Sequence, residues 1–205
     1  MGFGWLFVGY FFVQVMALYS PLSFAMLAGY PMIIMGLWHL AHYHPRFAFA
    51  FYFSLASLPF ALYFSLFSFS QLGLPISDAL FEGLLYEIAQ WGYFVFLIGL
   101  HLLLLYAVAG LTGELRLILL QSNAWRNMII VALFFVLDFL ARMPFLSEQR
   151  TLLALPLLLL RLCYIFLNLL LIFKCYRNIC SEEEGGLAPL IGQASPSKED
   201  RHDKE

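Results

Sequence analysis

The sequence predicts an all-α protein, a polytopic bundle of about six transmembrane helices. Of the 205 residues, 62% are hydrophobic and only 12% are charged, whereas soluble domains are about 45–50% apolar and about 25% charged. Aromatic residues make up 18% of the chain, including 22 Phe, and suit a lipid-facing surface. The apolar residues also fall into separate stretches long enough to cross a hydrocarbon core of ~30 Å.

These stretches define a single transmembrane domain over residues 1–180. A helix that crosses the membrane needs ~20 mostly apolar residues. Pro21 separates the first two stretches, because proline ends one helix and can open the next. The first stretch is short, so a re-entrant pair and five spans are the alternative. The expected spans are approximately residues 3–19, 22–42, 47–69, 88–110, 125–143 and 152–174.

The basic residues predict the orientation, because they concentrate on the cytoplasmic side of membrane proteins. With both termini cytoplasmic, Arg142 and Arg150 lie outside, and five basic residues flank the spans inside. Tryptophan favours the membrane interface, and all four tryptophans fall near predicted span ends. We therefore expect a multi-pass protein of the cell membrane. The inner basic residues are Arg46, Arg116, Arg126, Lys174 and Arg177, and the tryptophans are Trp5, Trp38, Trp91 and Trp125.

Three segments lie outside the apolar stretches. We expect the fourth span to begin early, as one helix from about residue 78, because Asp78 can cap it. Residues 113–122 predict a short interfacial helix before the fifth span. Residues 181–205 hold three basic and seven acidic residues. We expect a disordered acidic cytoplasmic tail there, because this composition buries too little apolar area to offset chain entropy.

Small residues recur along the third span at helical spacing. They form one face of the helix, while phenylalanines occupy the other faces. Such a face lets helices approach closely in lipid, and serine hydroxyls can hydrogen-bond across the gap. The face therefore predicts a helix-packing surface, and a polar lining for a solute path is the alternative. The residues are Ala50, Ser54, Ser57, Ala61, Ser65 and Ser68.

Asp138 and Arg161 are the ionisable residues placed deepest in the predicted spans. Counted from the inner side, they lie ~17 Å and ~16 Å deep at 1.5 Å per residue in a ~30 Å core. An unpaired charge there costs at least ~2.5–3.5 kcal/mol. We therefore predict an ion pair between Asp138 and Arg161. A static clamp is one interpretation of this pair, and an anion or proton site at Arg161 is the other.

Other polar residues also fall within the spans or at their ends. His39 and His42 share one face at the inner end of the second span, and His101 lies in the fourth. Imidazole is a common metal ligand, but no Glu-x-x-His or His-Glu-x-x-His motif accompanies these residues, so we expect no metal and no cofactor. Gln14 and Asn168 are amides of the kind that join helices by hydrogen bonds.

The end of the last span combines cysteines with basic residues. Cys175 and Cys180 could be S-acylated, because juxtamembrane cysteines are typical acylation sites, or they could be reduced cytosolic thiols. The segment 168–180, followed by Glu182-Glu183-Glu184, resembles the end of uncharacterised small multispan bacterial membrane proteins. The resemblance covers about a tenth of the chain. It implies no activity.

The sequence favours a non-catalytic protein. It lacks a nucleophile elbow, a P-loop and a dinucleotide-binding fingerprint, and it has no basic patch for nucleic acid. The leading hypothesis is a non-catalytic membrane component or partner subunit, with the lipid bilayer and other membrane subunits as its partners. The alternative is a small-solute or ion transporter or channel that uses Asp138 and Arg161. A membrane-embedded metal-dependent enzyme that uses the histidines is the third hypothesis.

Overall fold

The computed structural model describes residues 2–18, 20–74, 81–143 and 150–180. These ranges are helical and contain no β-strand, which confirms the predicted all-α fold class. Two 3₁₀ segments, Met16–Leu18 and Ser20–Ala25, join the first two helices, and a π-helical turn, Tyr176–Cys180, follows the last. The expected disordered tail, residues 181–205, lies outside the described residues. The α-helices are α1 (Gly2–Gln14), α2 (Met26–Ala41), α3 (Pro45–Gln71), α4 (Leu84–Glu114), α5 (Ile118–Ala141) and α6 (Arg150–Cys175).

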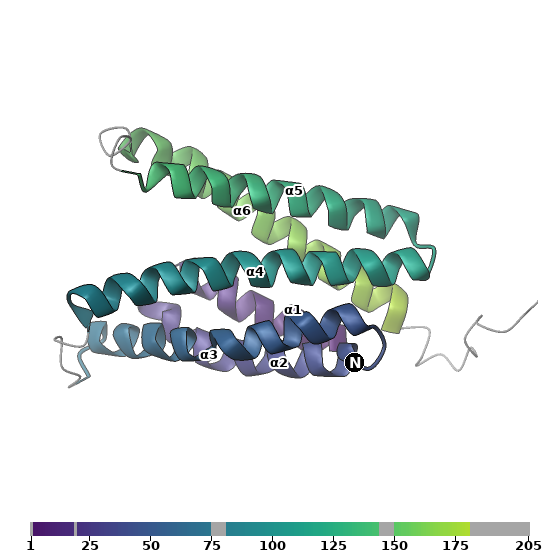
Figure 1. The fold of residues 1–205 in the computed structure, drawn as a ribbon, viewed down its shortest axis with the longest axis horizontal. Coiled ribbons are helices and arrows are strands. Elements are labelled where there is room, and N and C mark those ends of the chain that lie inside the picture. Colours follow the sequence, from purple (N-terminus) through teal and green to yellow (C-terminus); the bar gives the residue numbers. More distant parts are fainter. Residues whose placement is uncertain (1, 19, 75–80, 144–149, 181–205) are drawn as a thin grey trace, which may run out of the picture.

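The helices form a closed ring (Figure 1). Each helix packs against the next one along the chain, and α6 also packs against α1. Helix α6 runs obliquely, beginning beside α5 and reaching α1 further along. The start of α1 and the end of α6 therefore lie at the same end of the bundle. One cluster of buried side chains fills the interior and includes Leu6, Leu37, Phe47, Leu105 and Tyr164.

Four of the helices, α3 to α6, are long and apolar enough to cross a membrane, so the chain has the structure of a membrane protein. Helices α1 and α2 have only 13 and 16 residues. At 1.5 Å per residue they are ~20 Å and ~24 Å long, which is less than a hydrocarbon core of ~30 Å. The alternatives of five and six spans therefore depend on this short pair.

Glycines let α1 and α2 approach each other closely. A Cβ atom added at Gly9 would lie 2.7 Å from both the Gly29 carbonyl oxygen and the Ile33 nitrogen. A Cβ atom added at Gly36 would lie 2.8 Å from the Leu6 nitrogen. These neighbours are backbone atoms, which cannot rotate away as a side chain can. The two short helices thus form a tight antiparallel hairpin of the kind that small residues permit in lipid.

The helix boundaries differ from the prediction in three parts of the chain. Helix α1 ends and α2 begins well inside the expected spans, because the chain around Pro21 forms 3₁₀ turns. The expected helix start at residue 78, with Asp78 as its cap, lies outside the described residues; α4 begins at Leu84, after Gly83, which adopts a left-handed φ of 72°. The separate helix expected at 113–122 is wrong, because α4 continues to Glu114 and α5 begins at Ile118.

Candidate functional site

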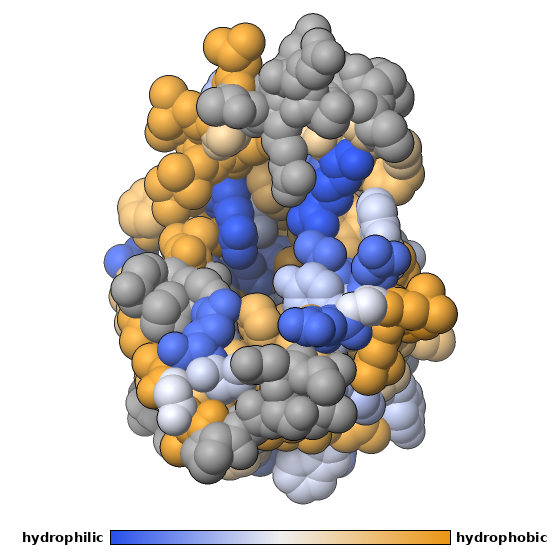
Figure 2. Space-filling model, turned by 90° about the vertical axis from the view of Figure 1, so that its left-hand side faces the viewer, coloured by the Kyte–Doolittle hydropathy of each residue, from blue (hydrophilic) through white to orange (hydrophobic). Residues whose placement is uncertain are grey.

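A partly open cavity of about 250 Å³ lies between the second half of α5 and the first half of α6. Figure 2 views the end of the bundle where α5 ends and α6 begins, and hydrophilic side chains surround a depression there. The charged lining comprises Asp138 and Arg142 from α5 and Arg161 from α6. The apolar lining comprises Phe134, Ala141, Ala154, Leu157 and Leu158. Both ionisable residues that the sequence placed deep in the membrane therefore meet at one cavity.

Asp138 forms its ion pair within its own helix. Its Oδ2 atom accepts a hydrogen bond from Arg142 Nε at 3.0 Å and forms an ion pair with Arg142 Nη2 at 2.9 Å. Residues four apart share one face of a helix, so this contact is local. The Arg142 guanidinium also lies over the Phe94 ring of α4, 4.8 Å from the ring centroid, which is a cation–π contact. The charge of Asp138 is therefore balanced without a residue from α6.

Arg161 has no ion pair with a carboxylate in the part of the chain that the structure describes. An ion pair between Asp138 and Arg161 stays a prediction, and the partner that Asp138 has in the structure is Arg142. This partner was not predicted from the sequence, because Arg142 was assigned to an outer loop, whereas Arg142 is the C-cap of α5. The i,i+4 spacing was the signal that could have identified it.

A cluster of polar side chains lies at the centre of the ring, and we call Tyr10, His101, Tyr164 and Asn168 the polar core. Arg161, Tyr164 and Asn168 follow one another at i, i+3 and i+7, so they share one face of α6. Asn168 Nδ2 donates a hydrogen bond to the Tyr10 hydroxyl of α1 at 3.0 Å, which confirms that this amide joins two helices. The His101 ring of α4 lies edge-on to the Tyr10 and Tyr164 rings, each 5.5 Å away between centroids.

Three atoms of the polar core are buried without a hydrogen-bond partner among the described residues: His101 Nε2, the Tyr164 hydroxyl and Asn168 Oδ1. His101 Nδ1 lies 2.7 Å from the Leu97 carbonyl oxygen. A carbonyl only accepts, so Nδ1 carries the proton and Nε2 of the neutral ring is an acceptor. The Arg161 side chain lies near the Tyr164 hydroxyl. The cavity and the polar core are therefore neighbouring parts of one polar region.

A second hollow, of about 390 Å³, lies between α4 and α5. Its lining is entirely apolar apart from the Tyr106 side chain, so it provides no group for acid–base or ionic chemistry. It faces outward from the helix bundle and suits contact with an acyl chain of a lipid. The lining residues are Leu102, Leu103, Tyr106, Met128, Ile129 and Ala132.

The small-residue face of α3 is buried, with each side chain at most 2% exposed. Ser54, Ser57 and Ser65 donate hydrogen bonds to carbonyl oxygens of their own helix, whereas the sequence analysis anticipated bonds between helices. The face contributes no residue to the cavity at Arg161. Its role in helix packing stays a prediction, which this burial supports. The six residues are Ala50, Ser54, Ser57, Ala61, Ser65 and Ser68.

The structure does not bring together the histidines considered as metal ligands. His39 and His42 lie at the end of α2, and both rings pack beside Trp38. His101 lies in the polar core and is 1% exposed. Within residues 2–18, 20–74, 81–143 and 150–180, no three His, Cys, Asp or Glu side chains form a group that could hold a metal ion.

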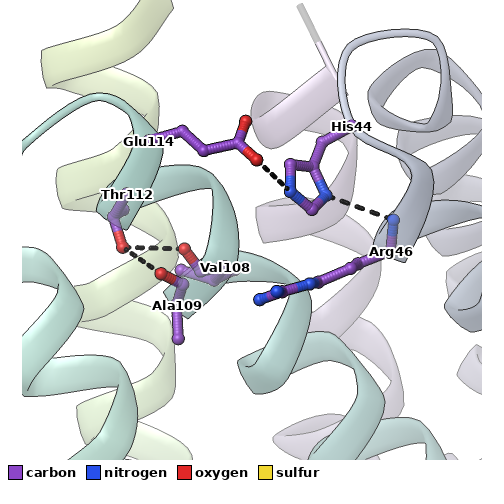
Figure 3. Close-up of polar contacts among 6 residues, drawn as sticks. All are labelled: His44, Arg46, Val108, Ala109, Thr112 and Glu114. Atoms are coloured by element: carbon purple, nitrogen blue, oxygen red, sulfur yellow. Dashed lines mark hydrogen bonds and ion pairs between the residues drawn. The ribbon is translucent and has the colours of Figure 1, made fainter.

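His44 connects α3 to the end of α4, at the opposite end of the bundle from the cavity (Figure 3). His44 Nδ1 accepts a hydrogen bond from the Arg46 backbone nitrogen at 3.1 Å and so caps α3. His44 Nε2 lies 3.1 Å from Glu114 Oε1. The Arg46 side chain extends along α4, with its guanidinium 4.5 Å from the centroid of the Tyr106 ring. These contacts fix the α2–α3 turn against α4.

The cysteine side chains differ in how exposed they are on the protein surface. Cys175 is fully buried, so an acyl group could reach it only after local rearrangement. Cys163 is exposed on α6, and the side chain of Cys180 lies outside the part that the structure describes. S-acylation at this end of α6 stays a prediction.

Comparisons of the chain with protein-family models, with curated proteins and with solved structures find no match. The resemblance of residues 168–184 to uncharacterised bacterial membrane proteins stays a prediction.

Proposed function

We propose that this chain is a multi-pass integral protein of the cell membrane that binds a small anion at Arg161, as a transporter or channel for that anion. One observation carries the proposal: Arg161 lines the cavity between α5 and α6, while Asp138 is paired with Arg142. A guanidinium at this depth costs at least ~2.5–3.5 kcal/mol unless a polar environment compensates it. Such residues typically face a bundle interior or a hydrated cavity and mark ion or substrate pathways.

The charges of the lining favour a negative ligand. With Asp138, Arg142 and Arg161 ionised, the lining carries one negative and two positive charges, so its net charge is +1. Arg142 is occupied by Asp138 and by the Phe94 ring. The guanidinium of Arg161 has no carboxylate partner among the described residues, and guanidinium groups bind carboxylate and phosphate oxygens through two parallel hydrogen bonds.

The size of the cavity limits the ligand. Its volume of about 250 Å³ is below the ~300–1,000 Å³ that is typical of pockets for drug-sized ligands. An inorganic anion or a short carboxylate fits this volume. The apolar side chains Leu157 and Leu158 line the same space, so a short hydrocarbon chain attached to a carboxylate would also be accommodated.

The leading hypothesis from the sequence was a non-catalytic partner subunit. It was supported by the absence of catalytic motifs and by the helix-packing face of α3. The pairing of Asp138 with Arg142 adds support for a solute site, because it leaves Arg161 without a described carboxylate partner. The structure therefore favours the solute-binding alternative over the partner subunit.

The test is thermal unfolding of the purified protein in detergent with chloride, formate, acetate or inorganic phosphate added. A ligand that binds only the folded state stabilises it by about 2.7 kcal/mol at 100 times its Kd. We expect at least one of these anions to raise the Tm of the wild type, and the same anion to have no effect on Arg161→Gln. Lys174→Gln is the matched control, because it removes an exposed positive charge from the last turn of the same helix.

Two results would contradict the proposal. One is that none of the four anions produces a larger rise in Tm in the wild type than in Arg161→Gln. The other is an equal loss of the effect in Lys174→Gln, which would indicate a response to net charge alone. Where an anion binds, its uptake into proteoliposomes by wild type and by Arg161→Gln distinguishes transport from binding.

A further inference from the structure

The geometry points to a water-binding site in the polar core, at the centre of the helix ring and deeper than the cavity at Arg161. The site is formed by Tyr10 from α1, His101 from α4, and Tyr164 and Asn168 from α6. It holds one or two water molecules, and it extends the polar region of the cavity into the middle of the bundle. This inference does not depend on anion binding at Arg161.

The hydrogen-bonding groups of the polar core match those of water. His101 Nε2 and Asn168 Oδ1 are acceptors without a partner among the described residues. The Tyr164 hydroxyl lies near the Arg161 guanidinium, which can only donate, so the hydroxyl's own proton has no acceptor among the described residues. The Tyr10 hydroxyl accepts from Asn168 Nδ2, so its own proton is available to donate. A water molecule donates two hydrogen bonds and accepts two, which satisfies two acceptors and two donors.

The four groups adjoin one another and are shielded from bulk solvent. Tyr10 is 3% exposed, His101 and Asn168 are each 1% exposed, and Tyr164 is fully buried. The His101 ring is 5.5 Å from both tyrosine rings, between centroids, and Asn168 bonds directly to Tyr10. Buried waters typically make ~3 hydrogen bonds to polar groups that would otherwise be unsatisfied. Several such groups in one place therefore form a better site for water than single scattered ones would.

Arg161 offers a route by which water reaches the polar core. It lines the cavity, and Tyr164 and Asn168 lie one and two turns further along the same face of α6. The guanidinium lies near the Tyr164 hydroxyl, so its charge is close to the proposed water. The cavity and the water site thus form a continuous polar track of side chains from the end of the bundle to its centre.

Tyr164→Phe tests the site because it removes only the hydroxyl, and the infrared measurement below separates the loss of water from the loss of the hydroxyl's contact with Arg161. If the hydroxyl has no water partner, deleting an unsatisfied buried group stabilises the protein. If the hydroxyl bonds to water, its deletion leaves the water with a missing hydrogen bond and destabilises the protein. We expect Tyr164→Phe to lower the Tm by about 2–8 °C. Tyr52→Phe, on an exposed face of α3, is the matched control and should leave the Tm nearly unchanged.

Infrared difference spectra between protein in ordinary water and in water labelled with oxygen-18 provide a second measurement. We expect the wild type and Tyr52→Phe to show an O–H stretching band of internal water that Tyr164→Phe lacks. The same band should also be lost in His101→Phe. An increase in the Tm of Tyr164→Phe, or a wild-type spectrum without an internal-water band, would overturn the inference. The wild-type spectrum decides the question even if a variant does not fold.

Discussion

Asp138 Oδ2 accepts a hydrogen bond from Arg142 Nε at 3.0 Å and forms an ion pair with Arg142 Nη2 at 2.9 Å, while Arg161 lines the same cavity from the neighbouring helix. The two arginines therefore have different roles. Arg142 belongs to a local pair that neutralises Asp138, and Arg161 contributes a charge that no described carboxylate balances. This difference leads to the first two predictions.

Removing the acid should harm folding more than removing Arg161. Asp138→Asn leaves the guanidinium of Arg142, which is 29% exposed, without its counter-charge. We expect this substitution to lower the free energy of unfolding by about 1–3 kcal/mol. Arg161→Gln removes a charge that costs at least ~2.5–3.5 kcal/mol to place in the membrane. We therefore expect Arg161→Gln to give at least the wild-type yield of monodisperse, membrane-inserted protein, and Asp138→Asn to give less. A collapse of the Arg161→Gln yield, with a normal yield for Asp138→Asn, would contradict this order.

Double-mutant cycles should locate the partner of Asp138. Contacting residues typically show coupling energies of about 0.5–3 kcal/mol. We expect a value in this range between Asp138→Asn and Arg142→Gln, and a smaller one between Asp138→Asn and Arg161→Gln. Unfolding free energies of the two single and one double variant in each cycle provide the measurement. If the second coupling equals or exceeds the first, Asp138 pairs with Arg161, and the clamp hypothesis regains its support.

The helical fold was predictable because a helix that crosses the bilayer must be apolar over the thickness of the hydrocarbon core, and the hydropathy of the sequence shows such stretches directly. The four long helices are apolar over more residues than the membrane requires, so the expected spans and the observed helices coincide closely. The errors occurred where local backbone chemistry decides a boundary. Gly83 fixes the start of α4 through its left-handed φ, and the chain around Pro21 adopts 3₁₀ turns instead of continuing a helix.

The candidate site was only partly predictable. Depth along a helix identified Asp138 and Arg161, since each residue adds a fixed rise. The polar core could not be assembled in this way, because Tyr10, His101 and Tyr164 come from three helices whose relative rotation the sequence does not reveal. The partner of Asp138 was missed for a simpler reason: Arg142 was counted as an outer-loop residue, although it is the C-cap of α5 and lies four residues after Asp138.

The α1–α2 hairpin should tolerate a methyl group at one glycine and not at another. A Cβ atom at Gly9 would lie 2.7 Å from backbone atoms of α2. Gly9→Ala should therefore lower the free energy of unfolding by about 1–3 kcal/mol through overpacking. At Gly4, in the same helix, the nearest atom would be in the Tyr176 ring at 3.5 Å. Gly4→Ala should therefore be neutral or stabilise by up to ~1 kcal/mol through helix propensity. Thermal unfolding compares the two, and equal effects would show that the close backbone approach does not limit packing.

Substitutions at His44 should distinguish the contributions of its two contacts to stability. Asparagine is among the best N-cap residues, so His44→Asn keeps an acceptor for the Arg46 backbone N–H but is too short for Glu114. His44→Ala loses both contacts and should be less stable than His44→Asn by about 1 kcal/mol. Because Nδ1 accepts from Arg46, the proton of the neutral ring is on Nε2, which donates to Glu114.

The same assignment predicts the behaviour of Glu114, which is 68% exposed. Glu114→Gln keeps an oxygen that accepts from His44 Nε2, so its unfolding free energy should stay within about 0.5 kcal/mol of the wild type. Glu114→Ala removes the acceptor and should cost about 0.5–1.5 kcal/mol, as for a typical hydrogen bond. Urea or thermal unfolding in detergent measures all four variants. Equal stabilities of His44→Asn and His44→Ala would exclude capping as the main role of His44, because both lack the contact to Glu114 and differ in the capping acceptor.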